Sequence, residues 1–258
     1  MIPLLHKMNY FRKYNIVLFV LLIANHVYAQ SNKQNTYVIV HGAWGGGWAF
    51  KAVDSMLTST GAKVYRPTLT GQGERVHLAS TAVGLETHIN DIVNTILFEE
   101  LDQVILIGHS YAGMVITGVA DRLPDRINKL VYMDALVPEH GESAEMIMGT
   151  LGGGHLQVID GHIIPPWVKE GTLPPKDVPH PAKTWSDTLE LKNTSRLKIP
   201  SYYILTVEEG TSPEQDRFAS QAKRAKEKNW TVRQLQADHN PQWSAPKALV
   251  QLFLEIAK

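Results

Sequence analysis

The chain has 258 residues, of which 44% are apolar and 19% charged, and its 25 Lys+Arg balance its 25 Asp+Glu. This length suits one ordinary domain, and this composition excludes an intrinsically disordered chain. A net charge of zero without a dominant basic patch argues against nucleic acid as a partner. The sequence has no cysteine, which excludes disulfides, thiolate catalysis and a lipid-modified cysteine anchor.

Residues 1–29 have the pattern of a secretory signal peptide. Three cations fall within the first 13 residues, the apolar run IVLFVLLIA follows, and small side chains at Val27 and Ala29 suit an export peptidase. The apolar run is short for a membrane span, and an uncleaved anchor is the alternative. We predict that residues 30–258 form an exported mature protein, periplasmic or secreted, with a net charge of about −3 and no stable membrane anchor.

Short buried runs alternate with helical spacing along the rest of the chain. The runs predict six strands, near 37–40, 63–65, 104–107, 129–133, 202–206 and 231–235. Helical spacing predicts helices over 48–59, 87–100, the stretch that ends at Leu123, 213–228 and 245–257. Alternation of this kind is typical of a parallel sheet with helices on both faces.

The stretch 138–199 breaks this rhythm. It contains GGG at 152–154 and two Pro-Pro pairs, and it has no clear strand. A loop of this length is unusual in a compact domain unless it is functional. We therefore predict a partly helical cap laid over one end of the sheet.

The hexapeptide GHSYAG places Ser110 between a buried strand and an apolar helix. A nucleophile elbow needs this context, because a sharp turn must lift the serine hydroxyl out of the sheet edge. The turn requires small residues two positions away on each side. Gly108 meets this on one side, and on the other Ala112 replaces the more usual glycine and leaves a methyl group to accommodate. The alternative is a tight turn whose serine only caps the helix.

A serine hydroxyl needs a base and a carboxylate that orients the base. His239 follows the last strand, which places it at the carboxyl edge of the sheet where sites in such folds gather. For the acid, Glu208 and Glu209 both follow the strand YYILT, and Asp134 follows the preceding strand. Neighbouring residues on an extended segment point opposite ways, so spacing alone leaves the acid open.

Two backbone N–H groups are candidates for an oxyanion hole, those of Ala43 and Tyr111. Tyr111 directly follows Ser110, and Gly42 lets the loop after the first strand turn tightly. Four tryptophans are candidates to line an apolar substrate pocket under the cap, with core packing as the alternative. They are Trp44, Trp48, Trp167 and Trp185.

The segments YVIVHGAWGGGW, GHSYAGMVITGVA, LVYMDALVP, YYILTVEEGTSPEQDRF and QADHNPQWSAPKALVQLFLEIA resemble plant methyl-salicylate esterases, hydroxynitrile lyases and their bacterial esterase relatives. The resemblance covers most of residues 36–257. It implies an α/β-hydrolase fold, with a mostly parallel six-stranded sheet, helices on both faces and a small cap inserted after the strand that ends near Asp134. It also implies that no cofactor or metal is used, and it places the triad acid on Glu209.

The lyase branch carries a threonine where Gly42 stands and a lysine directly after the catalytic histidine, where this chain has Asn240. The esterase branch is therefore the better match. We predict a serine hydrolase with Ser110, His239 and Glu209 that cleaves a small apolar or aromatic carboxylic ester through an acyl-enzyme. A cyanohydrin lyase and a non-catalytic ligand receptor on the same fold are the alternatives.

Overall fold

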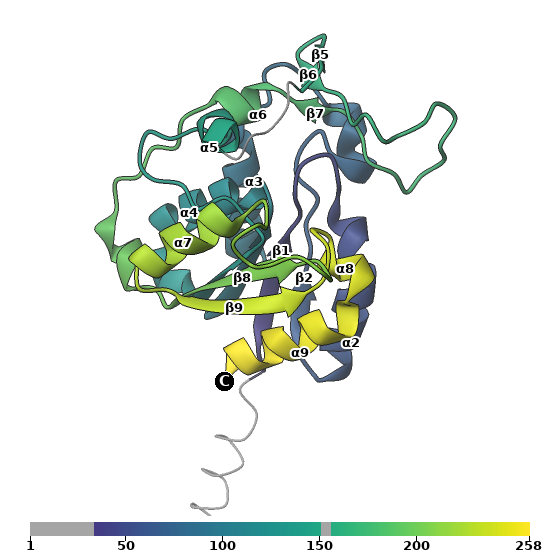
Figure 1. Cartoon of the computed structure of the whole chain (residues 1–258). Helices are drawn as coiled ribbons and strands as arrows, with labels where there is room; N and C mark the ends of the chain where they lie inside the picture. The colour runs from purple at the N-terminus through teal and green to yellow at the C-terminus, as the bar shows by residue number, and fades with distance from the viewer. Residues whose placement is uncertain (1–33, 151–155) are drawn as a thin grey trace, which may run out of the picture. The chain divides into compact units, whose positions relative to one another are not determined.

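The computed structural model describes residues 34–150 and 156–258, and Asn35–Lys258 form one compact unit (Figure 1). The predicted signal peptide, residues 1–29, lies outside the described residues and stays a prediction. Within the described ranges, no helix is both long and apolar enough to cross a membrane.

A six-stranded sheet forms the centre of the unit, in the order β2-β1-β3-β4-β8-β9, and all five pairings are parallel. Val40 of β1 lies opposite Gly108 of β3, which lies opposite Tyr132 of β4, so these three strands end side by side. The strands are β1 Thr36–Val40, β2 Lys63–Tyr65, β3 Val104–His109, β4 Ile127–Met133, β8 Ser201–Val207 and β9 Thr231–Gln236. The predicted six-stranded sheet is confirmed.

Helices cover both faces of this sheet, and alternate side chains of each strand point to opposite faces. In β3, Ile105 and Ile107 pack in the apolar cluster of α2 and α9, whereas Val104 and Leu106 pack in the cluster of α3, α4 and α7. Figure 1 shows α2 and α9 on one side of the strands and α3, α4 and α7 on the other. The helices are α2 Lys51–Ser59, α3 Leu85–Phe98, α4 Ala112–Arg122, α7 Ala219–Glu227 and α9 Pro246–Ala257.

Short helical turns complete the connections between these elements. They are η1 Gly47–Phe50, η2 Gly73–Leu78, η3 Pro124–Arg126, η4 Thr194–Lys198 and α8 Pro241–Ser244. The helix predicted over 213–228 is shorter than expected, because Asp216 Oδ1 accepts the N–H of Phe218 at 2.7 Å and α7 begins only at Ala219. This turn fixes Phe218 in place.

The predicted cap region, 138–199, joins β4 to β8. Its described residues contain short helices and, contrary to the expectation of no strand, a three-stranded antiparallel sheet β5-β6-β7. Each of these strands has two residues, which is too short to show an alternating pattern in the sequence. The elements are α5 Ala144–Thr150, β5 Val158–Ile159, β6 His162–Ile163, β7 His180–Pro181 and α6 Lys183–Ser186.

The returning end of the cap is tied to α4 by one buried carboxylate. Asp121 accepts the backbone N–H groups of Lys192 and Asn193 at 2.9–3.0 Å, and the guanidinium of Arg196 lies 3.3 Å from it. A buried carboxylate needs such donors, because an unpaired charge away from water is costly. The cap is therefore anchored on the helix that follows the strand-to-helix turn.

Candidate active site

Ser110 lies in the sharp turn between β3 and α4, at a φ of +55°. A non-glycine residue in this left-handed region costs about 1–3 kcal/mol and persists only where the surroundings impose it. A Cβ at Gly108 would lie 2.8 Å from the carbonyl oxygen of Ala112, so the turn excludes a side chain there. The turn has the strained conformation of a nucleophile elbow.

His239 connects Ser110 to a carboxylate. The Ser110 Oγ lies 3.0 Å from His239 Nε2, and His239 Nδ1 lies 2.6 Å from Asp134 Oδ2. Because the carboxylate can only accept, Nδ1 carries the proton and Nε2 is free to accept the serine proton. The His239 side chain is 38% exposed and the Asp134 side chain 2%, so the base is accessible while its carboxylate is shielded from water.

Asp134 follows β4 and is built into the sheet edge. Its φ is +45°, its N–H donates to Ile204 O at 2.8 Å, and its Oδ1 accepts the N–H of Thr206 at 3.2 Å. These bonds place the carboxylate between the ends of β4 and β8, with one oxygen toward His239. The backbone thus aims this side chain at the histidine.

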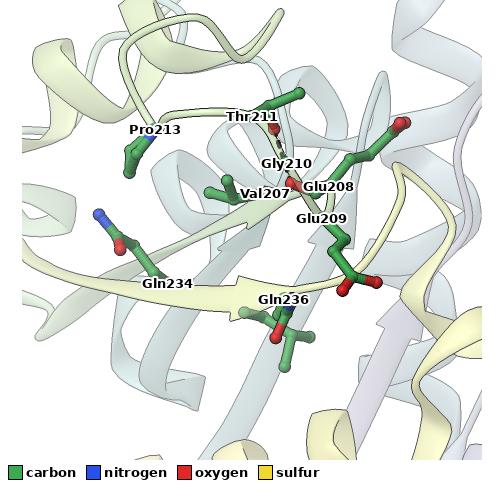
Figure 2. A pocket seen from close by; sticks show the side chains of 9 residues that line it. Val207, Glu208, Glu209, Gly210, Thr211, Pro213, Gln234 and Gln236 are labelled. Carbon is green, nitrogen blue, oxygen red and sulfur yellow. Dashed lines mark hydrogen bonds between the residues drawn. The ribbon is translucent and has the colours of Figure 1, made fainter.

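The prediction that Glu209 orients His239 is wrong in its geometry, because Asp134 occupies that position. Glu208 and Glu209 are exposed in a turn where Glu208 O accepts the N–H and the hydroxyl of Thr211. Figure 2 shows both side chains at a separate hollow of about 410 Å³, which shares no lining residue with the cavity at Ser110. The resemblance placed the acid one strand too far along the chain.

Two further side chains hold His239, and sequence analysis did not assign them this role. The buried His109 donates from Nε2 to the backbone oxygen of His239 at 2.7 Å, and the Phe218 ring stacks on the imidazole at 4.9 Å and 9°. Burial lowers the pKa of His109 to about 3, so this histidine is neutral at ordinary pH. In the sequence, only the position of His109 directly before Ser110 could have indicated that this histidine helps to hold His239.

The loop after β1 lies tightly against the elbow. A Cβ at Gly42 would lie 3.1 Å from Ser110 Cβ, and Ala43 and Tyr111 both line the cavity with Ser110. His41 Nδ1 donates to Gly42 O at 2.7 Å. In a trans peptide the N–H points opposite to the C=O, so this bond orients the N–H of Ala43 away from His41.

A cavity of about 930 Å³ opens over Ser110 and His239. Trp44, Trp167 and Trp185 are among its lining residues, and the rings of Trp167 and Trp185 pack on that of Trp44, with centroids 5.1 and 5.8 Å away. Trp48 does not line the cavity. Its ring instead stacks on that of Trp243, which does line the cavity and which sequence analysis missed.

Few charged side chains line this cavity. Asp177 accepts the indole N–H of Trp167 at 2.7 Å, and burial raises the pKa of its carboxyl group. Lys183 pairs with Asp187, and Arg217 lies beside Phe218. Over 34–150 and 156–258, no three His, Asp or Glu side chains are grouped to hold a metal ion. The arrangement offers a nucleophile, a base and apolar walls.

The chain matches the family model of the alpha/beta hydrolase family over residues 37–252. A carbendazim hydrolyzing esterase from Nocardioides sp. is 49% identical over 136 residues, which cover 49% of this chain and 56% of that protein. The putative methylesterase 11, chloroplastic, of Arabidopsis thaliana is 26% identical, covering 87% of this chain and 64% of that protein. The chain thus matches less than two thirds of the length of these relatives.

Solved structures show the same fold. The pyrethroid hydrolase PytH superposes with a TM-score of 0.72 at 22% identity, covering 87% of this chain and 98% of that one. An extracellular alpha/beta-hydrolase from a Paenibacillus species, described as a structural and functional homologue of tobacco salicylic acid binding protein 2, gives 0.68 at 24% identity, covering 86% and 98%. With the family match over most of its length, the chain belongs to the alpha/beta hydrolase family.

Proposed function

We propose that the chain is a serine esterase that cleaves small apolar or aromatic carboxylic esters through an acyl-enzyme. The hydrogen-bonded series of Ser110, His239 and Asp134 at the floor of an aromatic cavity carries this proposal. The names of the relatives, esterase and methylesterase, support the same class of reaction.

In the proposed reaction, Ser110 Oγ attacks the ester carbonyl carbon while its proton passes to His239 Nε2. Asp134 stabilises the imidazolium that forms. The N–H groups of Ala43 and Tyr111 donate to the oxygen that becomes negative in the tetrahedral intermediate. The intermediate collapses when His239 returns the proton to the leaving alcohol, and water then hydrolyses the acyl-enzyme by the same steps.

The cavity supports an aromatic or bulky apolar substrate. Its volume of about 930 Å³ is at the upper end of ordinary small-molecule sites, and aromatic side chains form much of its wall. Carbendazim and pyrethroids appear in the names of relatives, so both belong in a substrate screen beside aryl and methyl esters. We expect aromatic esters to have a lower KM than acetate esters of small alcohols.

The Ser110→Ala variant tests the proposal. We expect the wild type to hydrolyse p-nitrophenyl butyrate and the variant to lose at least 10³-fold in kcat, because only the hydroxyl can form the acyl-enzyme. A fluorophosphonate probe should label the wild type on the peptide that contains Ser110 and leave the variant unlabelled. Turnover that survives Ser110→Ala unchanged would falsify the proposal.

A further inference from the structure

Trp44 has a strained backbone that the cap holds in place. Its φ is +65°, and its N–H, its C=O and its indole N–H all bond to the cap region 138–199. The partners are His180 Nδ1 at 3.3 Å, the N–H of Val178 at 2.9 Å and Ile163 O at 3.0 Å. A tryptophan keeps a backbone conformation in the left-handed region only where surrounding contacts stabilise it. The three hydrogen bonds from the cap are such contacts.

Ala43 therefore lies between two immobilised peptide units. On one side His41 holds Gly42 O at 2.7 Å, and on the other side His180 holds the N–H of Trp44. The first contact comes from the strand end and the second from the cap. The Ala43 N–H belongs to the first of these peptide units, and the contact with His180 holds the second, so the backbone on both sides of Ala43 is fixed.

His180 is fully buried and contacts a neighbour of each proposed oxyanion donor, the backbone of Trp44 and the side chain of Tyr111. It accepts the N–H of Trp44, and its ring lies 5.0 Å from the ring of Tyr111 at 74°. Its Nε2 carries the proton and donates to Thr184 Oγ1 at 2.8 Å, and that hydroxyl donates to Pro181 O. Burial keeps the pKa of His180 well below its usual value, so Nδ1 remains an acceptor at neutral pH.

We propose that His180 is a positioning residue of the cap, which fixes the loop bearing the Ala43 N–H so that this donor is aimed at the developing oxyanion. The proposal rests on the esterase function proposed above. It makes the cap part of the catalytic machinery and not only a wall of the cavity, because removing one cap imidazole leaves Trp44 without the acceptor that orients its peptide.

A pair of substitutions at one position tests this role. His180→Leu fills much of the buried space and has no acceptor, whereas His180→Asn keeps an acceptor near the position of Nδ1. Loss of one oxyanion donor costs about 10²–10³ in kcat, so a misaimed donor should cost about 10- to 100-fold. We expect this fall in kcat for His180→Leu with KM within about threefold of wild type on p-nitrophenyl butyrate, and a partial recovery in His180→Asn.

The matched control is His140→Leu. His140 also lies in the cap and also accepts a backbone N–H through Nδ1, that of Leu191 at 3.0 Å, but Leu191 lies outside the loop that carries Ala43 and Trp44. We expect its kcat to stay within twofold of wild type. Should His180→Leu fail to fold, Thr184→Val provides the second variant, because it removes the partner of His180 Nε2 and should lower kcat in the same selective way.

Binding of an aryl trifluoromethyl ketone separates positioning from stability, because its adduct with Ser110 carries an oxyanion while a neutral alcohol product, such as benzyl alcohol from a benzyl ester, does not. We expect its inhibition constant to rise in proportion to the loss of kcat/KM in His180→Leu, with product inhibition unchanged. A wild-type kcat in His180→Leu with only a lower Tm overturns the positioning role and leaves the esterase proposal standing. A wild type that turns over no ester overturns both.

Discussion

At the scale of single residues, His239 is held from several directions. Asp134 accepts from Nδ1, His109 donates to the backbone oxygen, and Phe218 stacks on the ring. These contacts leave Nε2 directed at Ser110. A base fixed in this way needs no rearrangement when the substrate arrives.

Substitution of the two candidate acids distinguishes their roles. We expect Asp134→Asn to lower kcat about 10²–10⁴-fold, because an amide cannot stabilise the imidazolium and favours the wrong tautomer. Glu209→Gln should leave kcat within twofold, since its side chain is exposed at a separate hollow. Steady-state kinetics on p-nitrophenyl butyrate measures both, and the reverse order of effects would restore Glu209 as the acid.

The residues that the sequence could predict are those fixed by local context. Ser110 lies in a recognisable strand-turn-helix motif, and His239 follows the last strand. The acid could not be chosen in this way, because three carboxylates follow two neighbouring strands. The choice depends on a left-handed turn at Asp134 and on its bonds to β8, which only the three-dimensional structure supplies.

At the scale of elements, the first turn of α4 packs directly on the segment that follows β4. The N–H of Leu136 donates to Ser110 O at 3.0 Å, and a Cβ at Gly113 would lie 1.9 Å from Leu136 O. The elbow and the segment after Asp134 thus touch directly through their backbones. Their spacing sets the spacing of the serine and the acid.

We expect Gly113→Ala to lower the free energy of unfolding by about 1–3 kcal/mol and to lower kcat, because the added methyl group forces α4 away from the segment after β4. Urea unfolding and steady-state kinetics measure the two effects. Gly149→Ala in α5 is the control, since a Cβ there meets nothing within 4 Å and should cost no stability. Equal stability of both variants would contradict this packing.

The strands were predictable because buried β-branched runs are a strong local signal, as in β1 and β3. The sequence predicted the cap only as a break in the alternation of strands and helices between β4 and β8. Its two-residue strands carry no periodic pattern, and they pair only because the chain folds back over the cavity. The start of α7 likewise depends on a side-chain hydrogen bond, in which Asp216 Oδ1 accepts the N–H of Phe218.

At the scale of the whole molecule, four histidines within residues 34–150 and 156–258 are buried in the neutral form. Burial lowers the pKa of His41 and His88 to about 4 and that of His109 to about 3, and it lowers the pKa of His180 as well. In the unfolded chain each would titrate near 6.5. Below that pH the unfolded state binds protons that the folded state excludes.

We therefore expect the free energy of unfolding to be highest above pH 6.5 and to fall as the pH drops toward 4, by about 1–2 kcal/mol per buried histidine at pH 5. Urea unfolding at pH 7.5, 6 and 5 measures the slope. His88→Asn should make the slope shallower by the equivalent of about one bound proton, because it removes one histidine that the unfolded chain protonates and the folded chain does not. A free energy of unfolding that stays level or rises as the pH drops from 7 to 5 would contradict the neutral state of the buried histidines.

The location of the acid has a consequence for how this scaffold tolerates change. Ser110 and Asp134 stand at the ends of adjacent strands, so one inter-strand spacing of about 4.8 Å governs their separation. The bend after β8, residues 208–213, contributes lining residues to the separate hollow and none to the cavity at Ser110. We expect the protein to keep its activity when a peptide or an affinity tag is inserted into this bend. Insertion of one residue directly after β4 should abolish the activity.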